Sequence, residues 1–273
     1  GTTCVPDAWL LGLLVGDGGL TGSNVILSTG DGSILNHLQA IGVKHTYAGQ
    51  YDNRLPGMQQ RMHDVGLWHK KAEDKRVPEI IFQAKDDHIA QFVSGYLDAD
   101  GSINLHGGGS IEFYSMSKAL LTDVQLLLTR LGVVSVFSKK KGRYTRKDHV
   151  SWRLTVRGAD ITILAKLVKP RGARAQQLRD LVELQRKKGN CSGDAIDLFP
   201  KEAWELIDHT EHWFARQGYP KHNKRHKPTR EKLRKMAAIE GNSSLLDLVG
   251  APVLWDTIVS IENAGVQETW SLH

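Results

Sequence analysis

The chain has 273 residues, of which 40% are hydrophobic and 24% charged, a balance typical of a globular protein that buries a full core. No apolar run approaches the ~20 residues needed to cross a bilayer, and the N-terminus lacks a signal-peptide pattern, so the sequence predicts a soluble, intracellular (cytoplasmic) protein. The formal net charge of +6 favours a polyanionic partner without requiring one. Cys4 and Cys191 lack CxxC spacing, so neither a zinc ribbon nor a disulfide framework is indicated.

The first predicted element is an apolar helix that ends in an acid and a glycine, Trp9 to Gly18 (WLLGLLVGDG). Gly12 and Gly16 are four residues apart and therefore share one helix face. A face that carries only hydrogen atoms lets a second helix backbone approach closely. The sequence thus predicts a helix built to pair with another helix, with Asp17 at its C-terminal end.

The segments after this helix carry a mixture of strand and helix patterns. Apolar residues at helical spacing mark one segment, which Gly42 closes. Turn residues around Gly57 indicate a pair of strands beside it. The predicted elements are a strand at Asn24 to Ser28, a helix at Ser33 to Ile41, strands at Val43 to Tyr51 and Met58 to Asp64, and a helical segment at Pro78 to Gln83.

A second apolar run, Phe92 to Gly101 (FVSGYLDADG), repeats the first, with Gly95 and Ala99 four residues apart and Asp100 before the final glycine. Pairing of the two helices would bring Asp17 and Asp100 together at two helix C-termini. The helix dipoles and the mutual repulsion both disfavour two carboxylates there. A divalent cation such as Mg²⁺ removes that conflict. The alternative is that both runs are ordinary buried helices closed by a glycine C-cap.

The second half repeats the element order of the first, and 100 − 17 gives an 83-residue offset between the two acids. An internal duplication of an αββαββα unit is the economical interpretation. The predicted elements of the second half are a strand at Ser110 to Ser115, a helix at Lys118 to Leu131, a long hairpin formed by Val133 to Lys139 and His149 to Val156, and a helix at Ala159 to Val168.

The paired runs resemble the double signature of the LAGLIDADG homing endonucleases, as LLGLLVGDG and VSGYLDADG. The first copy departs from the signature at Val15 and Gly16, where the pattern has Asp and Ala. The resemblance implies an α+β fold in which two pseudo-symmetric αββαββα units form a DNA-binding saddle, followed by a helical basic extension. It also implies a monomer with internal pseudo-twofold symmetry that acts on double-stranded DNA with Mg²⁺ or another divalent cation.

The resemblance further implies which residues carry the chemistry. Asp17 and Asp100 would bind the catalytic metal, with the backbone carbonyls of Gly16 and Ala99 as additional ligands. The family usually places a lysine near each metal, where a cation steadies charge on the phosphate. Lys75 fits the first position, although it also reads as a surface residue of the charged run HKKAEDKR. Lys169 is the candidate for the second position, with Arg174 as the substitute. Asp98 is expected to have a structural capping role.

Basic and amide side chains on the predicted strands are the candidates for DNA contact, because a β-ribbon fits the major groove. A solvated hairpin tip is the alternative for the basic loop. The candidates are Gln50, Asn53, Arg54, Gln59, Gln60 and Arg61 in the first half, Lys139, Lys140, Lys141, Arg143, Arg146, Lys147 and Arg153 in the second, and Arg225 and Lys227 in the tail.

The tail is predicted to be helical and basic. A helix from Gly172 to Lys188 ends the core, and two more follow, one from Pro200 to Gly218 and one to about Ile239. The basic stretch from Gly218 to Lys235 suits phosphate contact or a solvated linker. A zinc site at His209, His212, His222 and His226 is disfavoured, because no cysteine accompanies these histidines and nearby cations would repel the metal.

The C-terminal LWDTIVSIENAGVQETWSLH alternates like a pair of strands and resembles the region of inteins that follows an inserted endonuclease; a simple terminal hairpin is the alternative. The chain begins with Gly1 and stops at His273, without the nucleophiles that splicing needs, so we expect the endonuclease portion of an intein. The expected domains are 8–84, 85–188, 189–249 and 250–273.

The leading hypothesis is a site-specific endonuclease that makes a double-strand break by metal-dependent phosphodiester hydrolysis. The alternative is a DNA- or RNA-binding protein without cleavage activity, such as a maturase or a regulator. Two carboxylates crowded at helix ends beside a polyanion give a pure binder no advantage, which favours the enzyme.

Overall fold

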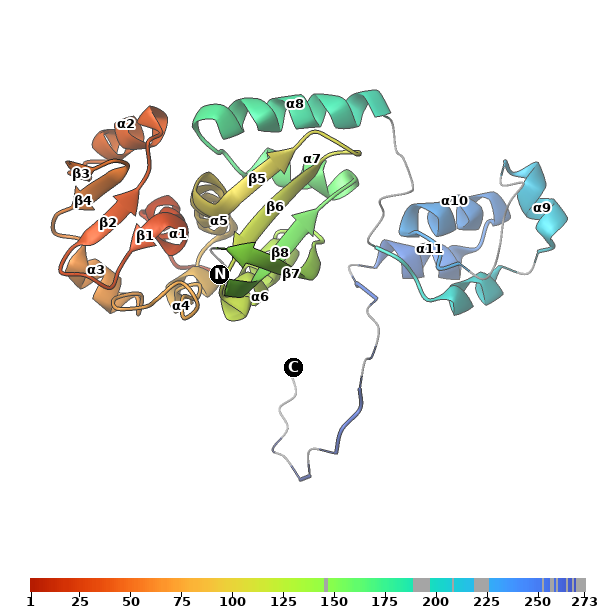
Figure 1. Ribbon diagram of the computed structural model, residues 1–273. Helices are drawn as coiled ribbons and strands as arrows, with labels where there is room; N and C mark the ends of the chain where they lie inside the picture. The colour runs from red at the N-terminus through yellow and green to blue at the C-terminus, as the bar shows by residue number, and fades with distance from the viewer. Residues whose placement is uncertain are drawn as a thin grey trace. The chain divides into compact units, whose positions relative to one another are not determined.

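A computed structural model describes most of residues 1–273, and its chain divides into two compact units, Gly1–Ile196 and Asp197–His273 (Figure 1). The backbone is described except at residues 145–146, 189–196, 208, 219–225, 252, 256–257, 259, 264, 267 and 269–273. Side chains are also left out at 141–149, 188 and 211. No helix among the described residues is long and apolar enough to span a membrane.

The first unit contains the same element order twice, which confirms the predicted α+β fold and its αββαββα repeat. The first copy consists of α1 (Ala8–Asp17), β1 (Gly18–Gly19), β2 (Val25–Ser28), α2 (Gly32–Ala40), β3 (Thr46–Gly49), β4 (Asp52–Leu55) and α3 (Gln59–Asp64), followed by α4 (Glu79–Phe82). The second consists of α5 (Asp86–Asp100), β5 (Gly101–Asn104), β6 (Ser110–Ser115), α6 (Lys118–Arg130), β7 (Val136–Tyr144), β8 (Lys147–Val156) and α7 (Ala159–Leu167), followed by α8 (Gly172–Lys188).

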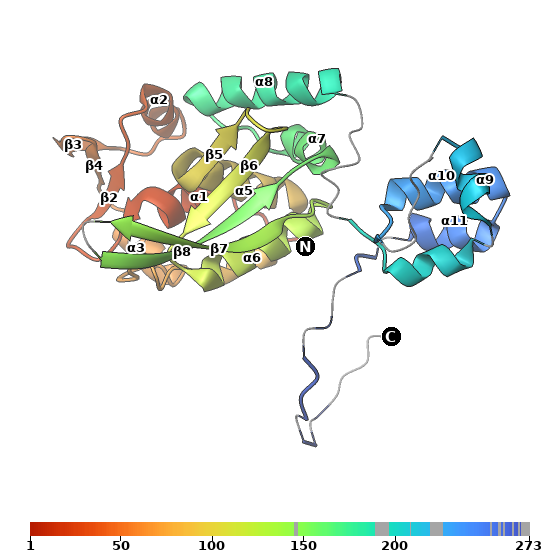
Figure 2. The ribbon, with the colours of Figure 1, turned by 45° about the vertical axis from the view of Figure 1, so that its right-hand side comes forward.

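The two sheets of the described residues have the same topology. Each has four antiparallel strands, in the orders β1-β2-β4-β3 and β5-β6-β8-β7. The register is equivalent as well, since Gly18 pairs with Leu27 in one sheet and Gly101 pairs with Phe113 in the other. Figures 1 and 2 show α1 and α5 side by side between the two sheets.

The helix pair α1 and α5 forms the centre of the hydrophobic core, and small residues allow its close approach. A Cβ added to Gly12 would lie 2.0 Å from Phe92 O, and one added to Gly95 would lie 1.9 Å from Trp9 O. These distances are far below van der Waals contact, so only glycine fits at either crossing point. The predicted seam of small residues therefore exists, and it fixes the ends of both helices relative to each other.

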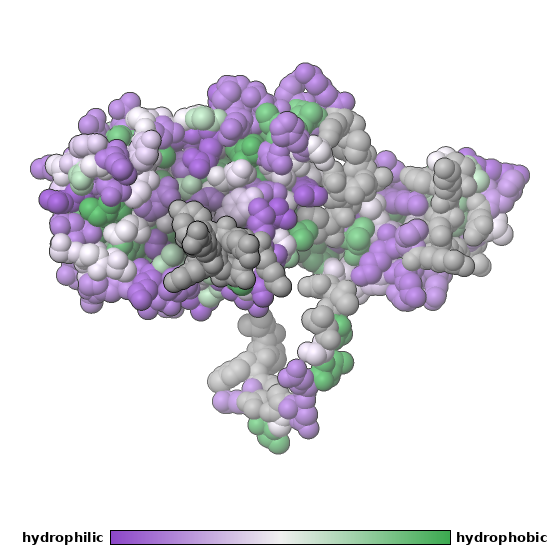
Figure 3. All heavy atoms as spheres, viewed as in Figure 1, coloured by the Kyte–Doolittle hydropathy of each residue, from purple (hydrophilic) through white to green (hydrophobic). Residues whose placement is uncertain are grey.

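Side chains alternate across both sheets, as the strand period of two requires. In β6 and β8 the residues Ile111, Phe113, Leu154 and Val156 are fully buried in the core. Residues of the other parity, among them Glu112, Tyr114 and Arg153, lie on the opposite face. In the coloured parts of the face that Figure 3 shows, hydrophilic residues predominate and the hydrophobic patches are small and separate.

Several predicted elements differ from the structure. Residues Met58 to Asp64 were predicted as a strand but contain the helix α3, whose Met62 is buried in the core. The hairpin strands β7 and β8 continue to Tyr144 and from Lys147, so the predicted basic loop is mostly strand. The predicted strand pair from Leu254 onward is wrong for the described residues of that segment, which contain no strand.

The second unit has a hydrophobic core of its own, in which Trp204, Phe214, Leu233 and Met236 are buried. The predicted helix after Pro200 is interrupted and forms two shorter segments. The helical segments are η2 (Lys201–Leu206), a 3-10 helix, and the α-helices α9 (Glu211–Arg216), α10 (Arg230–Glu240) and α11 (Ser243–Gly250).

Candidate metal and nucleic-acid site

The site begins with two aspartates that occupy the last positions of the paired helices α1 and α5. Gly18 and Gly101 follow them in extended conformation, with φ of −79° and −89°. At both places the backbone therefore passes directly from helix to strand. Both carboxylates are partly buried. Burial raises the pKa of Asp17 to about 6, and repulsion by Asp100 adds to the rise. Burial also raises the pKa of Asp100.

The close packing of the helix ends brings these two acids together. A Cβ added to Gly16 would lie 2.3 Å from the Cβ of Ala99 and 3.4 Å from Oδ2 of Asp100. Hydrogen at position 16 is therefore what lets Ala99, the residue before Asp100, pack against the end of α1.

Lys75 lies at the end of α1, although its neighbours in sequence suggest a surface position. Its side chain is buried, and its Nζ donates hydrogen bonds to the carbonyl oxygens of Gly16 at 3.0 Å and Gly18 at 2.8 Å. Burial lowers the pKa of this amine, and the two aspartates oppose the fall. Lys75 thus neutralises the negative end of the α1 dipole beside Asp17.

Arg174 occupies the equivalent place at the end of α5. Its Nη2 donates to Ala99 O at 3.0 Å and its Nε donates to Gly101 O at 3.1 Å. Gly16 and Gly18 become Ala99 and Gly101 on adding the 83-residue offset of the repeat, so Lys75 and Arg174 contact corresponding carbonyls. The positive charges of both residues lower the pKa of Asp17 and of Asp100, and thereby oppose the effect of burial.

Lys169, which was the predicted basic residue for the second half of the site, does not lie at this site. It is exposed, and its backbone nitrogen donates to Oγ of Ser94 at 2.9 Å, six residues before Asp100 on α5. The chain runs along α5 from this point, so that Arg171 N reaches Oδ1 of Asp98 at 2.7 Å. Only three residues later does a cationic side chain, that of Arg174, reach the end of the helix.

The donors at the helix ends suit a cation that takes its remaining ligands from substrate and water. Gly16 O and Ala99 O each accept one hydrogen bond, which leaves a second lone pair on each oxygen. Among the described residues, no group of three or more His, Cys, Asp or Glu forms a closed metal site. Two carboxylates with open positions are the arrangement in which Mg²⁺ binds together with phosphates.

Asp98 has a structural role that is wider than the predicted cap. Its buried carboxylate accepts hydrogen bonds from Nε1 of Trp9 at 2.9 Å and from Arg171 N, so it joins α1 to the chain that leads into α8. Among the histidines considered for zinc, His209 instead stacks on Trp213, with ring centroids 4.0 Å apart, and pairs with Glu240. His222 lies outside the described residues.

The candidates for DNA contact in the first half separate into two groups. Gln50 lies in the exposed turn between β3 and β4, and Arg54 lies on the exposed face of β4. Gln59 and Arg61 belong to α3, and both have partners: Gln59 donates to Ser23 O, and Arg61 forms two hydrogen bonds of 2.8 Å with Asp7. Asn53 is buried and donates to backbone carbonyls, including Thr29 O.

The basic residues of β7 point to opposite faces, because they lie in a strand. Lys140 lies over the ring of Tyr114, at 4.8 Å, on the polar face, where Arg153 is paired with Glu112. Lys139 lies over the ring of Trp152 instead, at 5.7 Å. Lys227 is exposed in the second unit. Arg146, Arg225 and the side chains of Lys141, Arg143 and Lys147 lie outside the described residues.

Comparison with known proteins bears on the second half of the first unit. Residues 87–169 match the family described as the LAGLIDADG-like domain. The matched range contains α5 with Asp100 and the hairpin of β7 and β8.

The chain is similar to parts of larger curated proteins. It is 27% identical over 234 residues to the replicative DNA helicase DnaB of Nostoc sp., a match that covers 77% of this chain and 26% of that protein. It is 26% identical over 161 residues to the DNA-directed RNA polymerase subunit Rpo1C of Methanocaldococcus jannaschii, covering 52% of this chain and 18% of the subunit. The chain therefore spans about a quarter or less of these relatives.

Among solved structures, the chain is similar to the endonuclease I-DmoI in complex with DNA and Ca. The sequence identity is 19% and the TM-score 0.44, and the match covers 64% of this chain and 96% of that one.

Proposed function

We propose that the chain is a site-specific DNA endonuclease of the homing type, which hydrolyses one phosphodiester bond in each strand of a duplex. The observation that carries the proposal is the pair of partly buried aspartates at the ends of α1 and α5, each with a cation beside it. Such crowding costs folding free energy, so it calls for a compensating use.

The proposed roles follow the pseudo-twofold arrangement. Asp17 and Asp100, with the carbonyls of Gly16 and Ala99, hold a divalent cation, which when bound supplies Lewis acidity toward the phosphodiester. Lys75 and Arg174 stabilise negative charge that develops on the phosphate at either side. Arg54, Lys140 and Arg153, from the polar faces of the sheets, contact the DNA and fix its register. Two equivalent cationic side chains, Lys75 and Arg174, suit a duplex whose two strands run in opposite directions.

We further propose that the chain is the endonuclease part of an element inserted into host genes, as in an intein. The similarity to a helicase and to an RNA polymerase subunit supports this, because these are different proteins and the match covers only a minor part of each. An element that moves between host genes would produce such a pattern.

Selection from a plasmid library with randomised inserts tests the activity and identifies the target. With Mg²⁺, the wild-type protein is expected to linearise a subset of plasmids that share one sequence. Asp17→Asn and Asp100→Asn are each expected to abolish double-strand cleavage and to retain binding to the selected DNA. Lys169→Ala serves as the matched control, since Lys169 lies away from the site, and it should cut normally.

Two results would contradict the proposal. Wild-type protein that binds a specific DNA sequence but never cuts it would favour a binding protein without cleavage activity. Normal cutting of both strands by either aspartate variant would remove these residues from the site.

A further inference from the structure

The two cationic side chains of the site are those of Lys75 and Arg174. Each belongs to a segment that is held by a helix from the opposite half of the repeat. Lys75 follows the first copy of the repeat and contacts the carbonyls of α1, but its neighbours in sequence are fixed to α6 of the second copy. Arg174 follows the second copy and contacts the carbonyls of Ala99 and Gly101. The residues before it are bonded to α5, and Arg171 and Gly172 also contact α2 of the first copy.

Asp123 on α6 fixes the segment that carries Lys75. Its carboxylate is buried and accepts hydrogen bonds from Nε and Nη2 of Arg76, at 2.9 and 2.6 Å, and from Val77 N at 3.3 Å. Ser117, which caps α6, donates from its Oγ to Lys75 O at 2.8 Å. The segment is thus tied to α6 at Lys75 O, Arg76 and Val77 N, directly after the lysine side chain.

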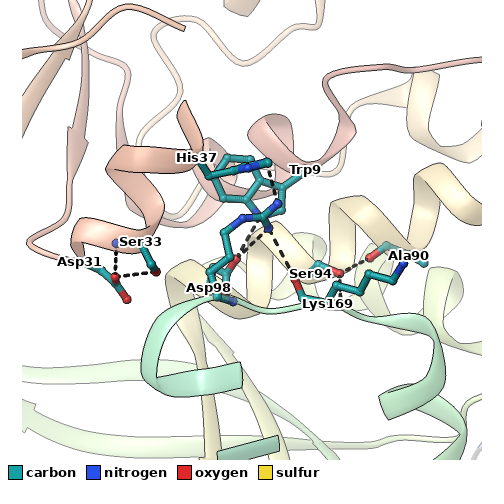
Figure 4. Close-up of polar contacts among 9 residues, drawn as sticks. Trp9, Asp31, Ser33, His37, Ala90, Ser94, Asp98 and Lys169 are labelled. Atoms are coloured by element: carbon teal, nitrogen blue, oxygen red, sulfur yellow. Dashed lines mark hydrogen bonds and ion pairs between the residues drawn. The ribbon is translucent and has the colours of Figure 1, made fainter. Parts of the chain in front are cut away.

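Arg171 and Gly172 fix the start of α8, which carries Arg174. One guanidinium nitrogen of Arg171 lies 2.6 Å from Nε2 of His37 on α2, and the guanidinium stacks 4.2 Å from the ring of Trp9. Another nitrogen lies 3.6 Å from Asp98. Figure 4 shows Trp9, His37 and Asp98 gathered at this point.

Gly172 extends the contact to the beginning of α2. It has a φ of +56°, and an added Cβ would lie 2.1 Å from Oδ2 of Asp31 and 2.9 Å from Oγ of Ser33. Asp31 accepts from the backbone N–H of Ser33 at 2.8 Å and so caps α2. The first residue of α8 therefore rests directly on the capped end of α2.

We propose that Asp123 and Arg171 are positioning residues. Asp123 fixes the position of the Lys75 side chain at the end of α1, and Arg171 fixes that of the Arg174 side chain at the end of α5. Because the cations stand at opposite ends of a pseudo-twofold site, each positioning residue governs cleavage of one DNA strand. Neither residue touches the substrate phosphate itself. The strand assignment rests on the proposed function, whereas the control over Lys75 and Arg174 does not.

Chemical labelling tests the positioning without any cleavage. An acylating reagent for amines reports the exposure of Lys75, and phenylglyoxal reports that of Arg174, each quantified by mass spectrometry. Asp123→Asn is expected to raise the labelling of Lys75 and not that of Arg174. Arg171→Ala is expected to do the reverse. Labelling that rises at both residues in both variants, or at neither, overturns the inference.

Single-turnover cleavage of an end-labelled duplex tests the strand assignment. Asp123→Asn is expected to slow one strand about tenfold more than the other, because small displacements of a positioning group cost that much or more. Arg171→Ala should slow the opposite strand, and each variant should accumulate DNA nicked in a different strand. Equal slowing of both strands would mean a merely structural role and would contradict the proposal.

Two further variants keep the test decisive if a substitution prevents folding, as judged by thermal unfolding. Arg76→Gln leaves Asp123 able to accept from Val77 N, and His37→Ala removes one partner of Arg171. Arg76→Gln should raise the labelling of Lys75, and His37→Ala should raise the labelling of Arg174. If the wild-type protein cuts no DNA, the proposed function fails, and the labelling result still decides the positioning.

Discussion

At the scale of residues, two opposing effects set the pKa values of Asp17 and Asp100: burial of the carboxylates and the positive charges beside them. The helix ends bury two carboxylates and raise the pKa of each, whereas Lys75 and Arg174 lower it. The signature alone predicted both acids. It did not predict that Lys75 is buried, because the surrounding run of charged residues is typical of a surface, nor that Arg174 and not Lys169 reaches the second helix end.

Asp17→Asn should stabilise the metal-free protein at neutral pH. The folded protein holds a proton on Asp17 up to a pKa of about 6, whereas the unfolded chain releases it near 3.8, so the stabilising contribution of the protonated acid is lost as pH rises through about 6. A difference of roughly 2 pKa units corresponds to about 3 kcal/mol at most, gained by the asparagine variant at pH 7.

Urea unfolding in the presence of a chelator, at several pH values, measures this gain. It should shrink as pH falls below 6 and be nearly gone at pH 3.5, below the unfolded pKa of 3.8, where the carboxyl of Asp17 is mostly protonated in both states. A gain of the same size at pH 3.5 would show that burial of the charge is not its cause.

At the scale of elements, hydrophobic periodicity predicted most helices and strands, since helices such as α2 and α6 have clear apolar faces. It failed at α3, a helix of six residues whose signal is the four-residue spacing of Met58 and Met62. It also predicted strands that are too short for the β7 and β8 hairpin, because lysine is depleted in strands. In the structure, backbone pairing continues through the basic residues. The terminal alternation gave no strand among the described residues.

The seam between α1 and α5 should tolerate no side chain. Gly12→Ala places a methyl group 2.0 Å from Phe92 O, so the helices must separate. Alanine favours a helix by about 1 kcal/mol, but overpacking costs typically 1–3 kcal/mol or more, and we expect a net loss of about 2 kcal/mol.

Chemical denaturation of the first unit checks the seam, with Gly22→Ala as control. A Cβ at Gly22 meets no atom within 4 Å, so this variant should stay within about 0.5 kcal/mol of wild type. Equal stability of the two variants would mean that the helices do not pack as closely as described.

The two faces of β7 should contribute unequally to DNA affinity. Lys140 lies on the polar face beside Tyr114, whereas Lys139 lies over Trp152. We expect Lys140→Ala to reduce the salt dependence of binding by about one ion and Lys139→Ala to leave it unchanged. Titrations of the selected duplex at several salt concentrations measure the slope. A larger effect of Lys139→Ala would assign the opposite face to DNA.

At the scale of the whole molecule, the repeat explains more than either half does alone. The 83-residue offset was visible in the sequence, and it predicted the shared topology of the two sheets. The exchange of support between the halves was not visible, because the Arg76–Asp123 and Arg171–His37 contacts join residues 47 and 134 positions apart. Such contacts depend on the packed fold and have no local sequence signal.

The central claim is that Asp17 and Asp100 together hold one cation beside the DNA. Crystals of the protein with its selected duplex and Mn²⁺ test it most directly, by anomalous scattering. We expect a manganese peak bound by carboxylate oxygens of both residues, at roughly 2.1 Å, as for Mg²⁺ in such sites. A peak held by neither aspartate, or carboxylates that face away from the DNA, would contradict the claim.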